Sequence, residues 1–251
     1  MKFRLTAFGL HLLGSASALA LVLGALYLGW YRWPGWYLSS VLHVVGIVVL
    51  VDLVLGPTLT LIVASPGKPR PVLARDIAII VTVQLVALGY GSVTLWSGRP
   101  LYYAFSVNSL DMVQASDVDA HELTLARREN PSFAPHWYSL PRWIWAPLPG
   151  DSAEAMKIVT GTLSGGGDVT DMPRYFKSWD AGLPELRKQL ARLDDIAYLG
   201  RKQKASLRTT MSARGLAPDE PNALVMWGGT RRVLAVFDPS TLQIRALLKA
   251  D

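Results

Sequence analysis

The side chains most able to do chemistry in this sequence lie within a long apolar stretch, residues 41–71. Asp52 stands near its middle, Gly56 and Pro57 follow one turn later, and Thr60 lies one turn further on. An acid and a helix breaker are both costly in lipid unless protein groups satisfy them. We therefore predict that Asp52 faces protein. Two roles stay open: contact with a bound partner, or a protonated acid with a purely structural hydrogen bond.

Another apolar stretch, at about 77–97, offers partners for this acid. With a helical rise of about 1.5 Å per residue, Tyr90 is expected at a depth similar to that of Asp52, and Gln84 is expected somewhat shallower. Thr hydroxyls near Pro57 are expected to satisfy the carbonyl that the proline frees, about one turn back near Leu53. His11 and His43 are predicted near opposite membrane faces, as interfacial residues rather than metal ligands.

The sequence carries no signature of an enzyme. The two remaining histidines, His121 and His136, have no zinc-protease or nucleophile-elbow setting, and the glycine-rich Ser164–Asp168 lacks the Lys of a phosphate-binding loop. The absence of cysteine excludes disulfides and thiolate zinc sites. We expect no catalytic residue, no cofactor and no metal.

An aromatic and proline-rich segment spans residues 130–150. Its prolines predict neither a helix interior nor a central strand. Trp137, Trp143 and Trp145 form a candidate outer contact patch, because large aromatic side chains held by prolines make rigid interaction surfaces. The alternative is an irregular core packed beside a sheet.

Charge and hydropathy divide the chain into two parts. Mean hydropathy is +0.26 and net charge is +6, and the apolar excess lies in the first hundred residues. Spanning helices are predicted at about 8–31, 41–64 and 77–97, and a cleaved signal peptide is the alternative for the first. Basic residues lie near the N-terminus (Lys2, Arg4) and between the second and third predicted spans (Lys68, Arg70, Arg75). By the positive-inside rule they predict a cytoplasmic N-terminus. We predict a transmembrane domain, 1–97, and a periplasmic domain, 98–251. No nucleic-acid partner is expected, because charge in the outer part is nearly balanced.

The outer part is expected to be a small α+β domain. Strands are predicted at 101–107 and 112–115, and helices at about 117–130, 183–194 and 202–214. The last 30 residues hold three β-rich runs separated by Gly228-Gly229 and Asp238–Ser240, which predict an antiparallel C-terminal sheet. The fold class is therefore three transmembrane α-helices followed by an α+β domain with an antiparallel C-terminal sheet.

Several motifs together resemble the TfpX/TfpZ family of type IV pilin accessory proteins. The matching stretches lie in the first 120 residues and in the closing 227–248 meander: Phe8–Leu12, Asp52–Pro57 with Leu59–Leu61, Pro66–Lys68, Asp76, Gln84–Gly91 and Gly98–Pro100. The segment at about 122–200 has no match.

The resemblance implies a multi-pass protein of the bacterial inner membrane that assists assembly of a cognate type IV pilin, in the manner of a chaperone, by binding it. It implies no enzymatic activity. Expected partners are a major or minor pilin, the lipid bilayer and other pilus-assembly proteins. Candidate contacts with the pilin helix are Asp52, Gly56, Pro57, Thr60, Gln84 and Tyr90. The alternatives are an envelope sensor or generic assembly factor with a ligand-binding periplasmic domain, and a membrane enzyme that modifies pilin.

Overall fold

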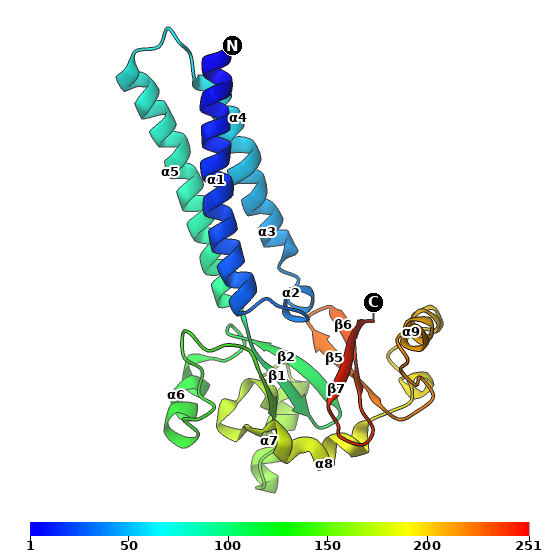
Figure 1. The fold of residues 1–251 in the computed structure, drawn as a ribbon. Coiled ribbons are helices and arrows are strands. Elements are labelled where there is room, and N and C mark those ends of the chain that lie inside the picture. The colour runs from blue at the N-terminus through cyan, green and yellow to red at the C-terminus, as the bar shows by residue number, and fades with distance from the viewer. Residues whose placement is uncertain (251) are drawn as a thin grey trace. The chain divides into compact units, whose positions relative to one another are not determined.

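The computed structural model describes residues 1–250, which form two compact units. The first unit comprises Met1–Arg32 and Ser40–Gly98, and the second comprises Trp33–Ser39 and Arg99–Asp251. The helices and strands of both units are labelled in Figure 1.

Three helices of the first unit are long and apolar enough to cross a membrane, as the sequence predicts. They are Lys2–Gly29, Leu42–Val63 and Arg70–Ser97. The first is α1 and the last is α5. Both helices start earlier than predicted: α1 starts at Lys2 rather than at residue 8, and α5 starts at Arg70 rather than at residue 77.

The middle helix has a π-helical segment at its centre. It consists of α3 (Leu42–Val49), the π-helical η1 (Leu50–Leu55) and α4 (Gly56–Val63). Pro57 has no N–H, and its ring would clash with the carbonyl four residues earlier in a regular α-helix, so the backbone widens by one residue before it. Asp52 lies in this widened segment. Helix α5 packs closely against α3, because Gly91 leaves room for the Val48 side chain.

The second unit is built on one mixed sheet of seven strands in the order β4-β3-β1-β2-β5-β6-β7. The strands are β1 (Pro100–Ser106), β2 (Ser109–Gln114), β3 (Arg142–Trp145), β4 (Lys177–Ser178), β5 (Ala223–Gly228), β6 (Arg231–Phe237) and β7 (Ile244–Lys249). The predicted antiparallel meander of β5, β6 and β7 is confirmed. The sheet as a whole is not antiparallel, however, because β1 pairs with β3 and β2 pairs with β5 in parallel. Long crossovers return the chain beside these strands in the same direction.

Strand β3 corrects the expectation for residues 130–150. Its four residues lie between Pro141 and Pro147 and contain no proline themselves, so their N–H groups are available for the ladder. The helices of this unit are α2 (Gly35–Leu38), α6 (Ala120–Glu129), α7 (Ser152–Leu163), α8 (Trp179–Gln189) and α9 (Arg201–Ala213), with short 3₁₀ turns at Val169–Asp171, Pro173–Tyr175 and Leu193–Asp195. Helix α6 is capped by Asp119, whose side chain accepts from Glu122 N at 2.7 Å. Helix α8 begins four residues before the predicted Leu183.

The link between the first two long helices belongs to the core of the second unit. Tyr37 and Leu38 of α2 are 4% and 0% exposed and pack with the strands, and a Cβ at Gly228 would overlap Leu38. Lys249 Nζ lies 5.1 Å from the Trp36 ring and 4.8 Å from the Tyr37 ring. This aromatic segment therefore forms one compact unit with residues 99–250.

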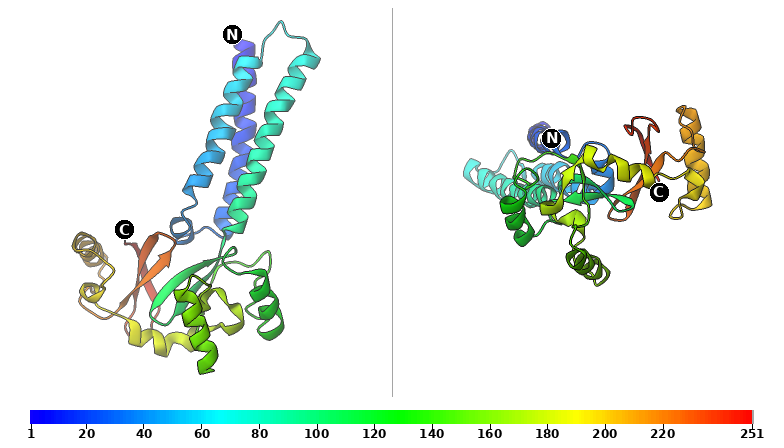
Figure 2. Two further views of the ribbon diagram at one scale, coloured as in Figure 1. Left: turned by 180° about the vertical axis from the view of Figure 1, so that it is seen from behind. Right: turned by 90° about the horizontal axis from the view of Figure 1, so that it is seen from below.

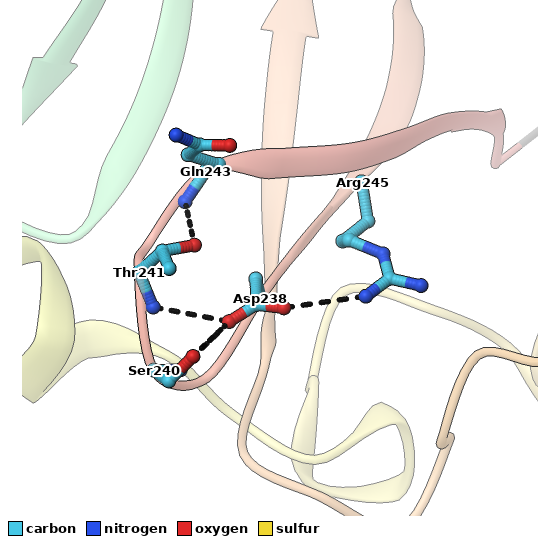
Figure 3. Close-up of polar contacts among 5 residues, drawn as sticks. All are labelled: Asp238, Ser240, Thr241, Gln243 and Arg245. Carbon is cyan, nitrogen blue, oxygen red and sulfur yellow. Dashed lines mark hydrogen bonds and ion pairs between the residues drawn. The ribbon is translucent and has the colours of Figure 1, made fainter.

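The hairpin loop between β6 and β7 is organised by Asp238 (Figure 3). Its Oδ1 accepts from Ser240 N at 2.9 Å and Thr241 N at 3.0 Å, and Arg245 donates to Oδ2 at 3.2 Å. These donors hold the pKa of the Asp238 carboxyl well below its usual range, with the Ser240 hydroxyl contributing most. The turn predicted at Asp238–Ser240 is confirmed.

Candidate functional site

A polar cluster joins all three long helices of the first unit. His11 of α1 contacts two partners: its Nδ1 lies 2.5 Å from Thr60 Oγ1 of α4, and its Nε2 lies 2.6 Å from Gln84 Oε1 of α5. Thr60 and Gln84 are 1% and 6% exposed. Because an unpaired polar group in lipid is costly, these contacts favour one arrangement of the three helices.

The Gln84 amide also satisfies the backbone that Pro57 disturbs. In the π-helical segment Gly56 N donates to Val51 O, five residues back. The next bond of that pattern would run from residue 57 to Asp52 O, but proline has no N–H. Gln84 Nε2 donates to Asp52 O instead, at 3.0 Å. The freed carbonyl is thus that of Asp52, not Leu53 as expected, because the widened turn shifts the hydrogen-bond register by one residue.

Gly56 makes this arrangement sterically possible. A Cβ at this position would lie 2.5 Å from Gln84 Oε1 and closer still to the amide nitrogen. The expected Thr contribution also differs, since the Thr60 hydroxyl meets His11 rather than a freed carbonyl. Asp52, Gly56, Pro57, Thr60 and Gln84 therefore come together on the facing sides of two helices.

The Asp52 carboxylate is buried and incompletely satisfied. The residue is 3% exposed, and Oδ2 has no hydrogen-bond partner among residues 1–250. It lines a cavity of about 540 Å³ whose other walls are Ala7, Leu10, His11, Gly14, Ser15, Ala18, Thr60, Ile77, Val81, Gln84, Leu85 and Leu88. An apolar cavity with one unsatisfied acceptor on its wall is a candidate binding site within the bundle.

Two residues lie elsewhere than the sequence suggested. Tyr90 is 76% exposed on the outside of α5, so Gln84 is the residue of the third helix that reaches Asp52. His11 belongs to the polar cluster rather than to a membrane face. Sequence reasoning missed it because the helix was expected to start at residue 8, about 4.5 Å before His11. Helix α1 instead starts at Lys2, about 13.5 Å before His11, so that His11 lies deeper in the bundle.

The three tryptophans of the candidate outer patch do not share one environment. Trp137 is 72% exposed. Trp143 and Trp145 are half-buried, and both pack against the hydrophobic core of the second unit. The Trp143 ring centroid lies 4.9 Å from that of Tyr103 and 5.2 Å from that of Trp179. Trp145 packs on Gly182 of α8, where a Cβ would lie 2.6 Å from its Cγ.

Buried acids of the second unit do not form a metal site. Burial raises the pKa of Asp111 to about 6 and that of Asp171 to about 6. Asp171 accepts from Asp168 N at 3.0 Å, and Asp111 accepts from Ser109 Oγ at 2.7 Å. Within residues 1–250, no group of three or more His, Asp or Glu side chains is placed to hold a metal ion.

Comparison with known proteins finds relatives of one kind. The chain is 24% identical to a fimbrial assembly protein, serogroup I, of Dichelobacter nodosus. The alignment extends over 216 residues and covers 84% of this chain and 81% of the relative. It is 26% identical over 217 residues to the serogroup E1 protein of the same organism, with the same shares covered. It is 28% identical over 118 residues to the protein of serogroups C1 and C2, which covers 47% of this chain and 90% of the relative.

No protein-family model matches the chain, and no solved structure is significantly similar to it. The similarity therefore relates this chain to fimbrial assembly proteins. Together with three helices of membrane-spanning length, it describes a membrane protein related to those proteins.

Proposed function

We propose that this protein is a TfpX/TfpZ-type accessory protein that assists assembly of a cognate type IV pilin by binding it. The observation that carries the proposal is the similarity over 84% of the chain to two fimbrial assembly proteins. The three apolar helices support it, because a pilin subunit that begins as a membrane protein needs a helper in the same bilayer. No catalytic activity and no cofactor are part of the proposal.

The proposed location is the bacterial inner membrane, with the second unit in the periplasm. Lys2 and Arg4 lie in the first turn of α1, Lys68 lies in the connection between α4 and α5, and Arg70 and Arg75 lie in the first turns of α5. Positive residues favour the cytoplasmic side. Residues 33–39 and 99–250 then lie together in the periplasm, which agrees with their forming one compact unit.

Two contact regions are proposed for pilin. Within the bilayer, the cluster of Asp52, Gly56, Pro57, Thr60 and Gln84 meets the apolar pilin helix, and the exposed ring of Tyr90 offers a second contact on α5. Outside the bilayer, Trp137 is the most exposed of the three candidate tryptophans and is open to a partner such as the globular part of pilin.

The test is an in-frame deletion in the native host, with complementation by the wild-type gene. We expect assembled pili to disappear while the pilin transcript stays unchanged, because the protein acts on pilin after its synthesis. Pili are counted by electron microscopy, and pilin is measured by immunoblot and by transcript. Normal piliation in the deletion strain would contradict the proposal.

The same strain separates the alternatives. A fall in pilin transcript would indicate an envelope sensor. A change in the mass of pilin, measured by intact-protein mass spectrometry, would indicate a modifying enzyme. Unchanged transcript and mass with pili lost is the outcome that supports an assembly helper.

A further inference from the structure

The cavity in the helix bundle is a groove between α1 and α5. Its lining residues on α1 lie between Ala7 and Ala18, and those on α5 lie between Ile77 and Leu88. Figures 1 and 2 show the backbones of the two helices diverging toward the N-terminal end of α1. At this level His11 Nε2 of α1 lies 2.6 Å from Gln84 Oε1 of α5.

The Asp52 carboxylate determines which kind of ligand the groove favours. Its buried Oδ2 lacks a hydrogen-bond donor among residues 1–250, although the same residue's backbone carbonyl is satisfied by Gln84. A buried acceptor left unsatisfied costs the full desolvation of that group, and more when it is charged. The groove therefore favours an occupant that brings a hydrogen-bond donor to the depth of Asp52.

The walls of the groove suit a helix. On α1 the residues Ala7, Gly14, Ser15 and Ala18 are small, and small residues allow the backbones of membrane helices to approach closely. On α5 the wall is formed by Gln84 and by branched apolar side chains, which pack well against another apolar helix. A lipid acyl chain would fill the space but would leave the Asp52 oxygen without a donor.

We propose that the groove between α1 and α5 binds one apolar transmembrane helix that donates a hydrogen bond to Asp52. The proposal rests on the proposed function, in which this helix belongs to pilin. The donor is an ammonium, a hydroxyl or a protonated acid. An ionised acid on the helix is excluded while Asp52 is itself ionised, because two neighbouring carboxylates repel each other in a medium of low dielectric constant.

Site-specific photocrosslinking in membranes of the native host tests the position of the helix. A photoreactive amino acid replaces Val81, which lines the groove, or Ile79, which is 58% exposed on α5 and does not line it. Two residues along a helix differ by about 200° in direction. We expect a pilin adduct, identified by antibody, from position 81 and a yield at least fivefold lower from position 79.

Two glycines of α1 provide a matched pair of blocking variants. Gly14 lines the groove and Gly9 does not, and a Cβ at either position meets nothing within 4 Å. They point about 140° apart around the helix. Gly14→Leu fills the groove and is expected to reduce the adduct from position 81 at least fivefold, whereas Gly9→Leu leaves it unchanged. Ala18→Leu gives a second blocking variant if the first accumulates poorly.

The donor requirement is tested by Asp52→Leu. This change removes the unsatisfied acceptor while retaining the backbone carbonyl that Gln84 meets. It should leave the protein in the membrane at normal levels but reduce the adduct about threefold, as expected for one hydrogen bond between membrane helices.

The outcomes distinguish this inference from the proposed function. Equal adducts from positions 79 and 81, or crosslinks from position 81 to lipid alone, would overturn the groove assignment even if the deletion strain lacks pili. An unchanged adduct in both Asp52→Leu and Gly14→Leu would overturn it as well. Normal piliation in the deletion strain would refute the proposed function instead.

Discussion

The substitution Gly56→Ala probes the link between the π-helical segment and the polar cluster. An added Cβ would lie 2.5 Å from Gln84 Oε1 and nearer to Nε2, well inside van der Waals contact. Gly56 is buried in the middle helix and Gln84 is only 6% exposed, so neither can move without cost. The amide must therefore withdraw from both Asp52 O and His11.

The magnitude follows from what the amide loses. Hydrogen bonds between membrane helices average about 0.6 kcal/mol each, and Gln84 gives up two of them. Overpacking adds about 1–3 kcal/mol. The sum is about 2–4 kcal/mol, against which alanine gains about 1 kcal/mol of helix propensity over glycine. The expected net loss is about 1–3 kcal/mol in the free energy of unfolding.

The assay is denaturant unfolding of the full chain in detergent micelles, followed by circular dichroism. Gly46→Ala is the control, because Gly46 lies in the same span and a Cβ there meets nothing within 4 Å. Helix propensity then cancels between the two variants, so Gly56→Ala should be the less stable by about 2–4 kcal/mol.

A double-mutant cycle completes the test. In a Gln84→Ala background the clash is absent, so adding Gly56→Ala should cost nothing further. The predicted clash with Gln84 is refuted if the Gly56→Ala and Gly46→Ala variants have the same free energy of unfolding. It is also refuted if Gly56→Ala lowers the free energy of unfolding by the same amount in the Gln84→Ala background as in the wild type.

Three further predictions concern the second unit. Gly228→Ala places a Cβ 2.9 Å from the backbone oxygen of Leu38 and should destabilise by about 1–3 kcal/mol, whereas Gly150→Ala, which meets nothing, serves as the control in thermal unfolding. Burial raises the pKa of Asp111 to about 6, so its contribution to stability is complete below about pH 4 and is lost as pH rises through about 6. Asp111→Asn should therefore raise the free energy of unfolding by up to about 3 kcal/mol at pH 7.5 and have little effect at pH 4. Urea unfolding at the two pH values measures this difference, and an equal gain in stability at both would contradict the raised pKa. Asp238 has a lowered pKa, so Asp238→Ala should destabilise the hairpin at neutral pH and have less effect as pH falls below about 4, as followed by hydrogen exchange of the loop amides.

Local features of this protein could be predicted well from the sequence. The three apolar stretches appear as helices, because an uninterrupted run of about 20 apolar residues leaves the backbone few alternatives in lipid. The closing meander follows from short β-rich runs and two turn signatures. The requirement for a partner at Asp52 and the disturbance at Pro57 were also visible, since each is a property of one residue type in an apolar setting.

Long-range arrangement could not be predicted. That β5 lies beside β2 in parallel depends on the crossover between them, about 110 residues long, in which no local pattern specifies direction. Likewise, nothing in the residues of the 33–39 link indicates that Leu38 fills a site under Gly228 in a sheet formed two hundred residues later.

In the candidate site, too, the residue types could be predicted from the sequence but their spatial arrangement could not. Residue types alone determined that Asp52, Pro57 and Gln84 are polar or helix-breaking residues in helices long enough to span a membrane. The free-energy cost of placing such a residue in lipid follows from its own side chain, so it is visible in the sequence. Only the tertiary structure decided that His11 joins them, that Gln84 rather than Tyr90 meets Asp52, and that one carboxylate oxygen stays unsatisfied beside a groove. Those outcomes depend on the rotation and spacing of three helices, which are set by packing contacts such as that of Gly91 with Val48.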